Sequence, residues 1–226
     1  MEKETLLLTI GVLGGTGKEG KGLAYRWAKA GYQILIGSRS SEKAVSAAAE
    51  IIELLEGEGS VVGMDNSEAA QRANIVVLTV PFAAHRDTLE NVKEYLKGKL
   101  LIDVTAPLVP PKVSKVQMPP AGSAAQEAKE IVGEGVEVVA AFQNISHEHL
   151  LGDGDVDCDV LVTGTSKDAR HEAIKLVEAA GLVGWDAGPI ENSVVVEGLT
   201  SVLININKQY GSTHSGIRIT GVTRKE

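Results

Sequence analysis

The stretch that decides the fold is Leu13-Gly14-Gly15-Thr16-Gly17-Lys18-Glu19-Gly20. It follows an apolar run over residues 6–13 that is typical of a buried parallel strand. It precedes a helical pattern over residues 20–30, which Gly31 ends as a C-terminal cap. A glycine-rich turn between a strand and a helix predicts the first unit of a layered α/β fold.

Within this turn, Gly15, Gly17 and Gly20 have the spacing G-x-G-x-x-G. The first glycine permits a tight turn, the second lets the backbone approach a pyrophosphate, and the third lets the helix pack on the strand. The free N–H groups at the start of the helix then favour phosphate binding. The motif in this setting predicts a dinucleotide site that uses Gly15, Thr16, Gly17 and Gly20.

Apolar runs and helical patterns alternate over the next 85 residues or so. Strands are expected at 34–36, 61–62, 75–80 and 100–104, with helices between most of them. The order predicts an α/β protein with a doubly wound, Rossmann-type parallel sheet. We expect a dinucleotide-binding Rossmann domain over residues 1–152 and a smaller C-terminal α/β unit over 153–226 that helps to form the cleft for a second ligand.

The chain changes character after Thr105, where a loop holds five prolines. It is either a rigid wall beside a ligand or a plain connection. Beyond it we expect helices at 123–132 and 167–180 and strands at 136–142, 160–163 and near 183. In the last helix an amphipathic face is predicted at Val195, Leu199, Val202 and Ile206, and this helix serves either as a dimer face or in domain packing.

The composition of the 226 residues excludes several classes of protein. The net charge of −8 disfavours binding to nucleic acid or to an anionic membrane. A single cysteine excludes a disulfide framework, and no apolar run reaches the roughly 18 residues of a membrane span. The first residues, Met1 to Glu4, lack the form of a signal peptide. We expect a soluble cytoplasmic protein that binds small molecules and forms a homodimer or a higher homo-oligomer.

The end of the second strand indicates which dinucleotide binds. An NAD site usually has an acidic residue there, which holds the ribose 2′-hydroxyl. Here the chain has Ser38, Arg39 and Lys43 instead. Arginine and serine can hold a 2′-phosphate through charge-assisted hydrogen bonds. These residues favour NADP(H) over NAD(H).

The next two strand ends are expected to approach the nicotinamide, because ligands bind beyond the carboxyl ends of parallel strands. The fourth strand ends with Thr79, Val80, Pro81 and Phe82, which offer an apolar surface for the ring. The fifth ends at Asp103, which either binds a ligand or ties down the following loop.

These motifs together resemble the NADP-dependent reductases of coenzyme F420, an 8-hydroxy-5-deazaflavin. The resemblance extends over nearly the whole chain. It is carried by residues 13–24, 37–39 with Lys43, 78–81, 123–126, 186–189 and 197–200. It implies hydride transfer between NADP(H) and the deazaflavin, the second substrate. In such a reaction the cofactors carry the chemistry and the protein aligns them, so no catalytic acid, base or nucleophile is expected.

The resemblance also implies that Gln143 and Ile145 frame the deazaflavin. Archaeal members of the family carry a histidine where this chain has Gln143. Glutamine can hydrogen-bond the ring but cannot carry a proton as an imidazolium does. Two other functions stay open. The change at Gln143 allows an NADPH-dependent reductase of a flavin, quinone, imine or metal chelate, and the lack of catalytic acid–base residues allows a non-catalytic NADPH sensor.

No metal site is predicted. His147 and His149 lack a clustered carboxylate or cysteine partner. The acidic run over 152–159 resembles a calcium loop but has Cys158 where the EF-hand pattern requires glycine.

Overall fold

The computed structural model describes residues 8–152, 154 and 156–223. Its element order confirms the predicted α/β class and the Rossmann-type sheet. The strands are β1 (Thr9–Leu13), β2 (Gln33–Ser38), β3 (Ser60–Asp65), β4 (Ile75–Leu78), β5 (Leu100–Asp103), β6 (Glu137–Ala140), β7 (Asp159–Gly164) and β8 (Val183–Pro189). The helices are α1 (Lys18–Lys29), α2 (Ser41–Leu54), α3 (Asn66–Arg72), α4 (Phe82–Val92), α5 (Ala124–Val132), α6 (Lys167–Ala179) and α7 (Ser193–Tyr210).

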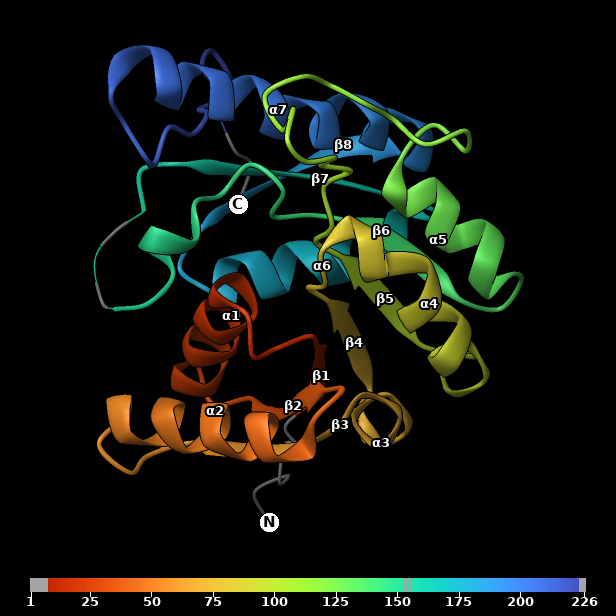
Figure 1. The fold of residues 1–226 in the computed structure, drawn as a ribbon, viewed down its shortest axis with the longest axis vertical. Coiled ribbons are helices and arrows are strands. Elements are labelled where there is room, and N and C mark those ends of the chain that lie inside the picture. Colours follow the sequence, from red (N-terminus) through yellow and green to blue (C-terminus); the bar gives the residue numbers. More distant parts are fainter. Residues whose placement is uncertain (1–7, 153, 155, 224–226) are drawn as a thin grey trace.

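The strands form one twisted sheet in the order β3-β2-β1-β4-β5-β6-β7-β8 (Figure 1). All neighbours pair in parallel except β6 and β7, which are antiparallel. This order places β1 and β4 side by side at the centre, and the chain winds outward from them in both directions. The carboxyl ends of β1, β2, β4, β5 and β6 therefore share one edge of the sheet, which is where such folds bind ligands.

Two apolar cores lie on opposite faces of the sheet. One face is covered by α1, α2 and α6, whose buried side chains include Trp27, Ile51 and Leu176. The other is covered by α3, α4 and α5, with Leu89 and Ala128 among the buried side chains. Strands buried on both faces explain why β1, β4 and β5 read as continuous apolar runs rather than as alternating ones.

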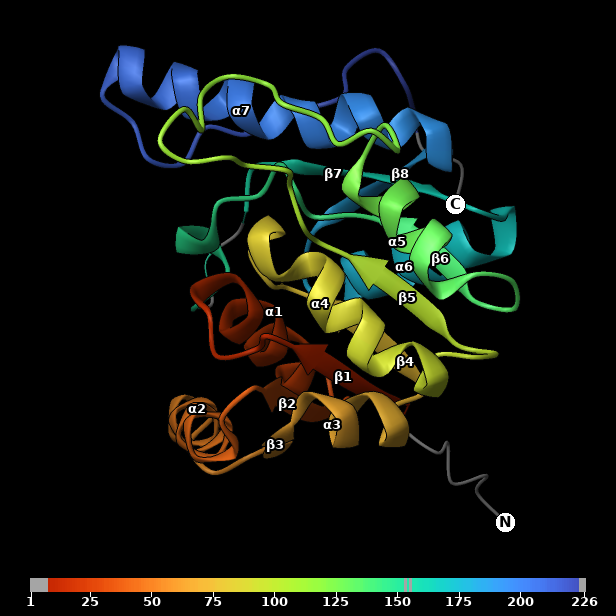
Figure 2. The same cartoon turned by 45° about the vertical axis from the view of Figure 1, so that its right-hand side comes forward.

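Helix α7 runs alongside β7 and β8, beside the proline-rich loop that follows β5 (Figures 1 and 2). The helix is present as predicted. Three of the four residues predicted for its apolar face, however, lie at the surface instead of packing inward. Val195, Val202 and Ile206 are exposed, whereas Ser193, Val196, Glu197, Gly198, Ser201 and Leu203 are buried. Small and polar residues face inward because α7 packs closely on its neighbours: a Cβ at position 198 would lie 3.0 Å from the Met118 side chain.

The sheet continues across the predicted domain boundary, since β7 and β8 extend it beyond β6. The division into 1–152 and 153–226 stays a prediction, and residue 153 lies outside the described residues. So do Met1 to Glu4 and part of the acidic run at 152–159. Within the described part of the chain, none of the helices combines the length and apolar character that a membrane crossing requires.

Candidate functional site

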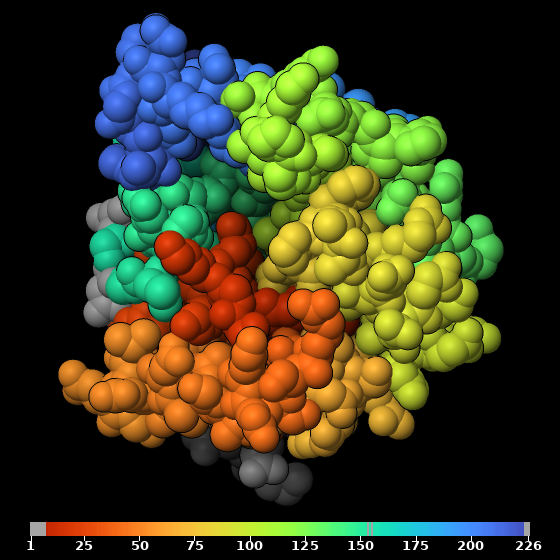
Figure 3. Space-filling model, in the orientation of Figure 1, coloured from red at the N-terminus to blue at the C-terminus, as the bar shows by residue number. Residues whose placement is uncertain are grey.

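A cleft of about 760 Å³ opens at the carboxyl ends of the central strands. Figure 3 shows this hollow between the N-terminal segments, in red and orange, and the upper part formed by the proline-rich loop and α7. Its volume lies within the usual range for a ligand site. The predicted residues that line it are Thr16, Gly17, Ser38, Arg39, Lys43, Thr79, Val80, Pro81, Phe82, Gln143 and Ile145.

The two remaining predicted residues, Gly15 and Gly20, lie behind the lining and shape the turn. A Cβ on Gly15 would lie 2.7 Å from the Val12 carbonyl oxygen, and one on Gly20 would lie 2.7 Å from the Gly15 Cα. Both distances are too short for any side chain. The left-handed residue of the turn is Gly14, whose φ is +72°. These glycines let α1 begin directly above β1.

Helix α1 presents its amino end to the cleft. Its N-cap residue is Gly17, which provides no side-chain hydrogen bond, so the first N–H groups of the helix lack a side-chain cap. Such groups and the helix dipole attract phosphate oxygens. A Cβ on Gly17 would meet nothing closer than 3.6 Å, which leaves the backbone open to a ligand. The turn therefore fits a pyrophosphate.

A second set of phosphate-binding groups lies where β2 ends. Ser40 caps α2 by accepting a hydrogen bond from the Lys43 N–H at 3.4 Å. This cap keeps Arg39 and Lys43 on the same side, and both are exposed. Asp65, the nearest strand-end acid, is already used: its carboxylate accepts the Glu68 N–H at 2.8 Å and caps α3. Arg39 and Lys43 are thus two basic side chains that follow β2, a strand that does not end in an acidic residue. This arrangement fits a 2′-phosphate.

The opposite end of the cleft is formed by Gln143, which follows β6. The residue before it, Phe142, is fully buried with φ at +75°, an unusual conformation for an aromatic residue. Its ring packs edge-on against Trp27, with ring centroids 5.8 Å apart. The core thus holds a strained backbone that turns Gln143 toward the cleft.

The amide of Gln143 is held in one orientation. Its Nε2 donates to the Asp103 backbone carbonyl at 2.8 Å, and the backbone carbonyl of Gln143 accepts from Thr200 Oγ1 at 2.8 Å. Its Oε1 is buried and has no partner among the described residues. A buried acceptor without a partner is costly, so the cleft fits a ligand that brings an N–H or O–H donor to this point.

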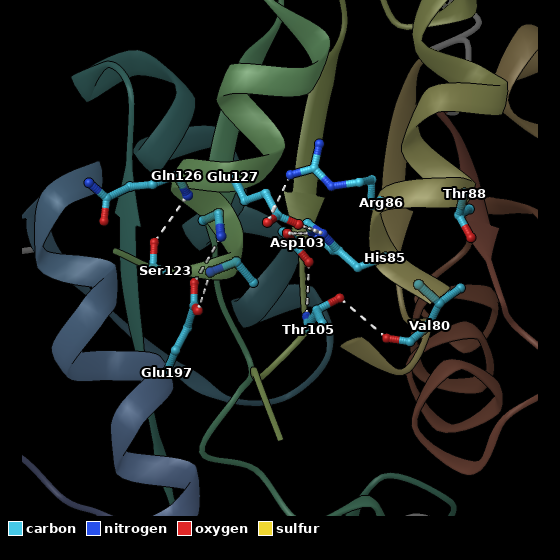
Figure 4. Close-up of polar contacts among 12 residues, drawn as sticks. Val80, His85, Arg86, Thr88, Asp103, Thr105, Ser123, Gln126, Glu127 and Glu197 are labelled. Atoms are coloured by element: carbon cyan, nitrogen blue, oxygen red, sulfur yellow. Dashed lines mark hydrogen bonds and ion pairs between the residues drawn. The ribbon is translucent and has the colours of Figure 1, made fainter. Parts of the chain in front are cut away.

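Asp103 does not line the cleft. It is fully buried, and its Oδ1 accepts the Thr105 N–H at 2.9 Å (Figure 4). Of the two roles left open by the sequence, the structure therefore shows the one in which Asp103 ties down the start of the following loop. That loop is also more than a plain connection, because Ala106, Leu108 and Pro110 line the cleft.

Sequence reasoning missed several lining residues. Asn66 accepts the Gly14 N–H at 3.3 Å, and Thr200 approaches from α7. Glu19 was visible as an unassigned position of the glycine motif. It also lines the cleft, and one of its carboxylate oxygens is buried without a partner among the described residues. Burial raises the pKa of Glu19 to about 8.

No metal centre emerges from residues 8–152, 154 and 156–223, where no three His, Cys, Asp or Glu side chains are placed to hold an ion.

Comparison with known proteins decides the family. The family model "NADP oxidoreductase coenzyme F420-dependent" matches residues 9–107. The F420-dependent NADP reductase of Methanothermobacter marburgensis is 43% identical over 95% of this chain and 99% of its own length. The chain belongs to the F420-dependent NADP reductase family. This finding confirms the resemblance carried by the glycine turn and the later motifs.

Two further relatives agree with this assignment. The F420-dependent NADP reductase of Methanocaldococcus jannaschii is 38% identical over 95% of this chain and 99% of its own. A crystal structure from Arthrobacter sp. FB24, whose description also names F420 and NADP, superposes with a TM-score of 0.78 at 26% identity. It covers 94% of this chain and 99% of its own. Family members thus share the length and the fold of the whole chain.

Proposed function

We propose that this chain transfers a hydride between NADP(H) and coenzyme F420. The observation that carries the proposal is the continuous cleft from the glycine turn to Gln143 in a chain of this family. When bound together, the nicotinamide and the deazaflavin supply the hydride donor and acceptor. The protein contributes binding, alignment and exclusion of water.

The part of the cleft proposed for NADP(H) is formed by three short stretches from the first 82 residues. The Gly15–Gly17 turn and the amino end of α1 hold the pyrophosphate, and Gly20 allows the close approach of helix and strand. Ser38, Arg39 and Lys43 hold the 2′-phosphate. The apolar surface from Thr79 to Phe82 supports the nicotinamide ring.

The F420 end uses residues from distant parts of the chain. Gln143 Oε1 accepts a hydrogen bond from the ring system, and Ile145 packs against it. Gln143 performs this role as a neutral amide, so no proton needs to be stored at this position. Lys112 and Lys115, exposed on the proline-rich loop, are placed to attract an anionic tail.

The test is to mix the purified chain with NADPH and oxidised F420 and to follow the visible absorbance of the deazaflavin. Bleaching with matching oxidation of NADPH supports the proposal. Oxidation of NADPH only with a flavin, quinone, imine or metal chelate would replace F420 by another acceptor. Tight NADPH binding without turnover of any acceptor would indicate a sensor instead.

We also propose a homodimer formed through α7. Val194, Val195, Val202 and Ile206 form an exposed apolar stripe, with Val195 71% accessible. Such a stripe is unusual on a surface that stays in water. Sedimentation should give twice the mass of the chain, and Val195→Asp combined with Ile206→Asp should give the monomer. A cytoplasmic location without nucleic-acid partners is likewise proposed, and the net charge of −8 supports the latter.

A further inference from the structure

A group of charged side chains, buried except for the exposed Arg86, lies directly behind the wall of the cleft. We call it the His85 cluster: His85 and Arg86 on α4, Asp103 at the end of β5, and Glu127 on α5 (Figure 4). His85 Nε2 lies 2.7 Å from Asp103 Oδ2, and His85 Nδ1 lies 3.3 Å from Glu127 Oε1. Arg86 reaches the second Glu127 oxygen at 3.0 Å. His85 and Asp103 are fully buried.

The geometry requires a positively charged imidazole. Both ring nitrogens of His85 face carboxylate oxygens, so a neutral ring would leave one lone pair against a negative charge. Burial lowers the pKa of His85, but Asp103 and Glu127 together outweigh burial and raise it above its ordinary value. With His85 protonated, two cations balance two carboxylates, and the cluster is neutral as a whole.

One more acid faces this region. Glu197 on α7 accepts the N–H groups of Ala124 and Ala125 at 2.6 and 3.0 Å, at the start of α5. Burial, with the charge of Asp103 adding to it, raises the pKa of Glu197 to about 8. Glu197 is therefore satisfied by the helix end and does not compete for His85.

The cluster is connected to the lining of the cleft by several direct contacts. Thr105 donates its N–H to Asp103 Oδ1 and its hydroxyl to the Val80 carbonyl at 3.3 Å. Asp103 also accepts from the Gln143 amide through its backbone carbonyl. The His85 ring packs against Phe82, with centroids 5.8 Å apart. Every residue reached in this way lines the cleft.

We propose that the His85 cluster is a positioning device that sets the distance between the nicotinamide wall and Gln143. The His85 cluster joins α4 and α5 to the end of β5. Through Thr105 and the Asp103 carbonyl it also connects to Val80 after β4 and to Gln143 after β6. It thus adds to the sheet and to the Thr200 contact that hold these strand ends. Desolvation offsets much of the attraction in a buried ion group, so its net contribution to stability is small. The main effect of the His85 cluster is to fix the positions of the cleft residues that it contacts. Hydride transfer depends strongly on the placement of the two rings that these residues hold.

This inference rests on the proposed function for its kinetic readout. The variant His85→Gln removes the cation and one of the two ring contacts, and His171→Gln makes the same change at an exposed site on α6. We expect kcat for F420 reduction to fall about 100-fold in His85→Gln. The Kd for NADPH should stay within about twofold, because the phosphates bind at the other end of the cleft. The primary isotope effect with 4-deuterated NADPH should rise as hydride transfer becomes rate-limiting. His171→Gln should match the wild type.

A lower melting temperature with unchanged kcat and isotope effect would overturn the proposal and leave the cluster a structural feature. If His85→Gln does not fold, Thr105→Val keeps the cluster intact and removes only the Thr105 hydroxyl link to Val80. Thr105→Val should lower kcat by a smaller factor than His85→Gln. A wild-type kcat in this variant would count against a positioning role of the His85 cluster.

Two measurements do not depend on F420 at all. In the binary complex with NADPH, the nicotinamide fluorescence of His85→Gln should differ from the wild type at equal affinity. In the wild type, the ¹⁵N signals of His85 should show that its pKa lies above 6.5, the ordinary histidine value. Titration near that value, or identical fluorescence, would refute positioning, whereas absence of F420 reduction by the wild type would refute only the proposed function.

Discussion

The two ends of the cleft are built in different ways. The phosphate end comes from two short stretches, residues 14–20 and 38–43, and it works through backbone geometry and exposed basic side chains. The ring end combines tips of β4, β5 and β6 with α7, and it works through buried side chains that hold one another. Under the proposed function, phosphate binding therefore depends on short stretches of the chain, whereas alignment of the reacting rings depends on the whole fold.

The largest effect on the local end is expected from Gly20→Ala. The new Cβ would meet Thr79 Oγ1 at 2.6 Å and the Gly15 Cα at 2.7 Å, so α1 must move away from β1. We expect a loss of about 3 kcal/mol in the free energy of unfolding, measured by urea denaturation. NADPH affinity should fall at least about tenfold as the helix end is displaced.

Gly154→Ala is the matched control, since a Cβ there meets nothing within 4 Å. Equal stability of both variants would show that the turn is not tightly packed and would weaken the contrast between the two ends.

The second prediction concerns cofactor choice. Arg39→Ala should weaken NADPH binding by about 1–3 kcal/mol through loss of a charge-assisted contact and leave NADH binding nearly unchanged. Titration calorimetry with both cofactors measures this. Because the change is confined to the phosphate end, kcat at saturating NADPH should stay the same. Equal losses for NADPH and NADH would mean that Arg39 does not contact the 2′-phosphate.

The smallest effect is a pH dependence that comes from Glu19, beside the glycine turn. Its pKa is raised from 4.5 to about 8, so the folded state keeps the proton over a range where the unfolded state has lost it. The free energy of unfolding should therefore fall as the pH rises from 4.5 to 8 and level off above that. Glu19→Gln removes this contribution, so its free energy of unfolding should exceed that of the wild type by more at pH 8 than at pH 5.

The measurement is urea denaturation of both proteins at pH 5 and at pH 8.5. Glu197 contributes a slope of the same sign, so only the difference between the variant and the wild type isolates Glu19. An identical difference at both pH values would contradict the assignment.

The same difference between the two ends of the cleft explains which features could be predicted from the sequence. Glycine spacing after an apolar run predicts the turn, because close packing of α1 on β1 depends only on residues a few positions apart. The strand ends at Val80 and Thr105 could be placed at the ligand edge from the topology. The partners of Asp103 could not, since His85 and Glu127 lie on helices whose facing sides are set by packing. The packing of α7 could not be predicted for a related reason. Periodicity shows that a helix has an apolar face, but it does not show what that face packs against.

By itself the sequence determined the α/β order, the dinucleotide turn and the basic residues after β2, because each rests on short-range geometry of backbone and charge. Only the tertiary structure decided that Gln143 Oε1 is buried without a partner among the described residues, that Asp103 faces His85 instead of the ligand, and that α7 turns Val195 and Val202 to solvent. These outcomes depend on which buried polar groups find partners across the sheet. That matching depends on the packing of distant segments, because most buried polar groups in a folded protein have a hydrogen-bond partner and the partners here come from different elements.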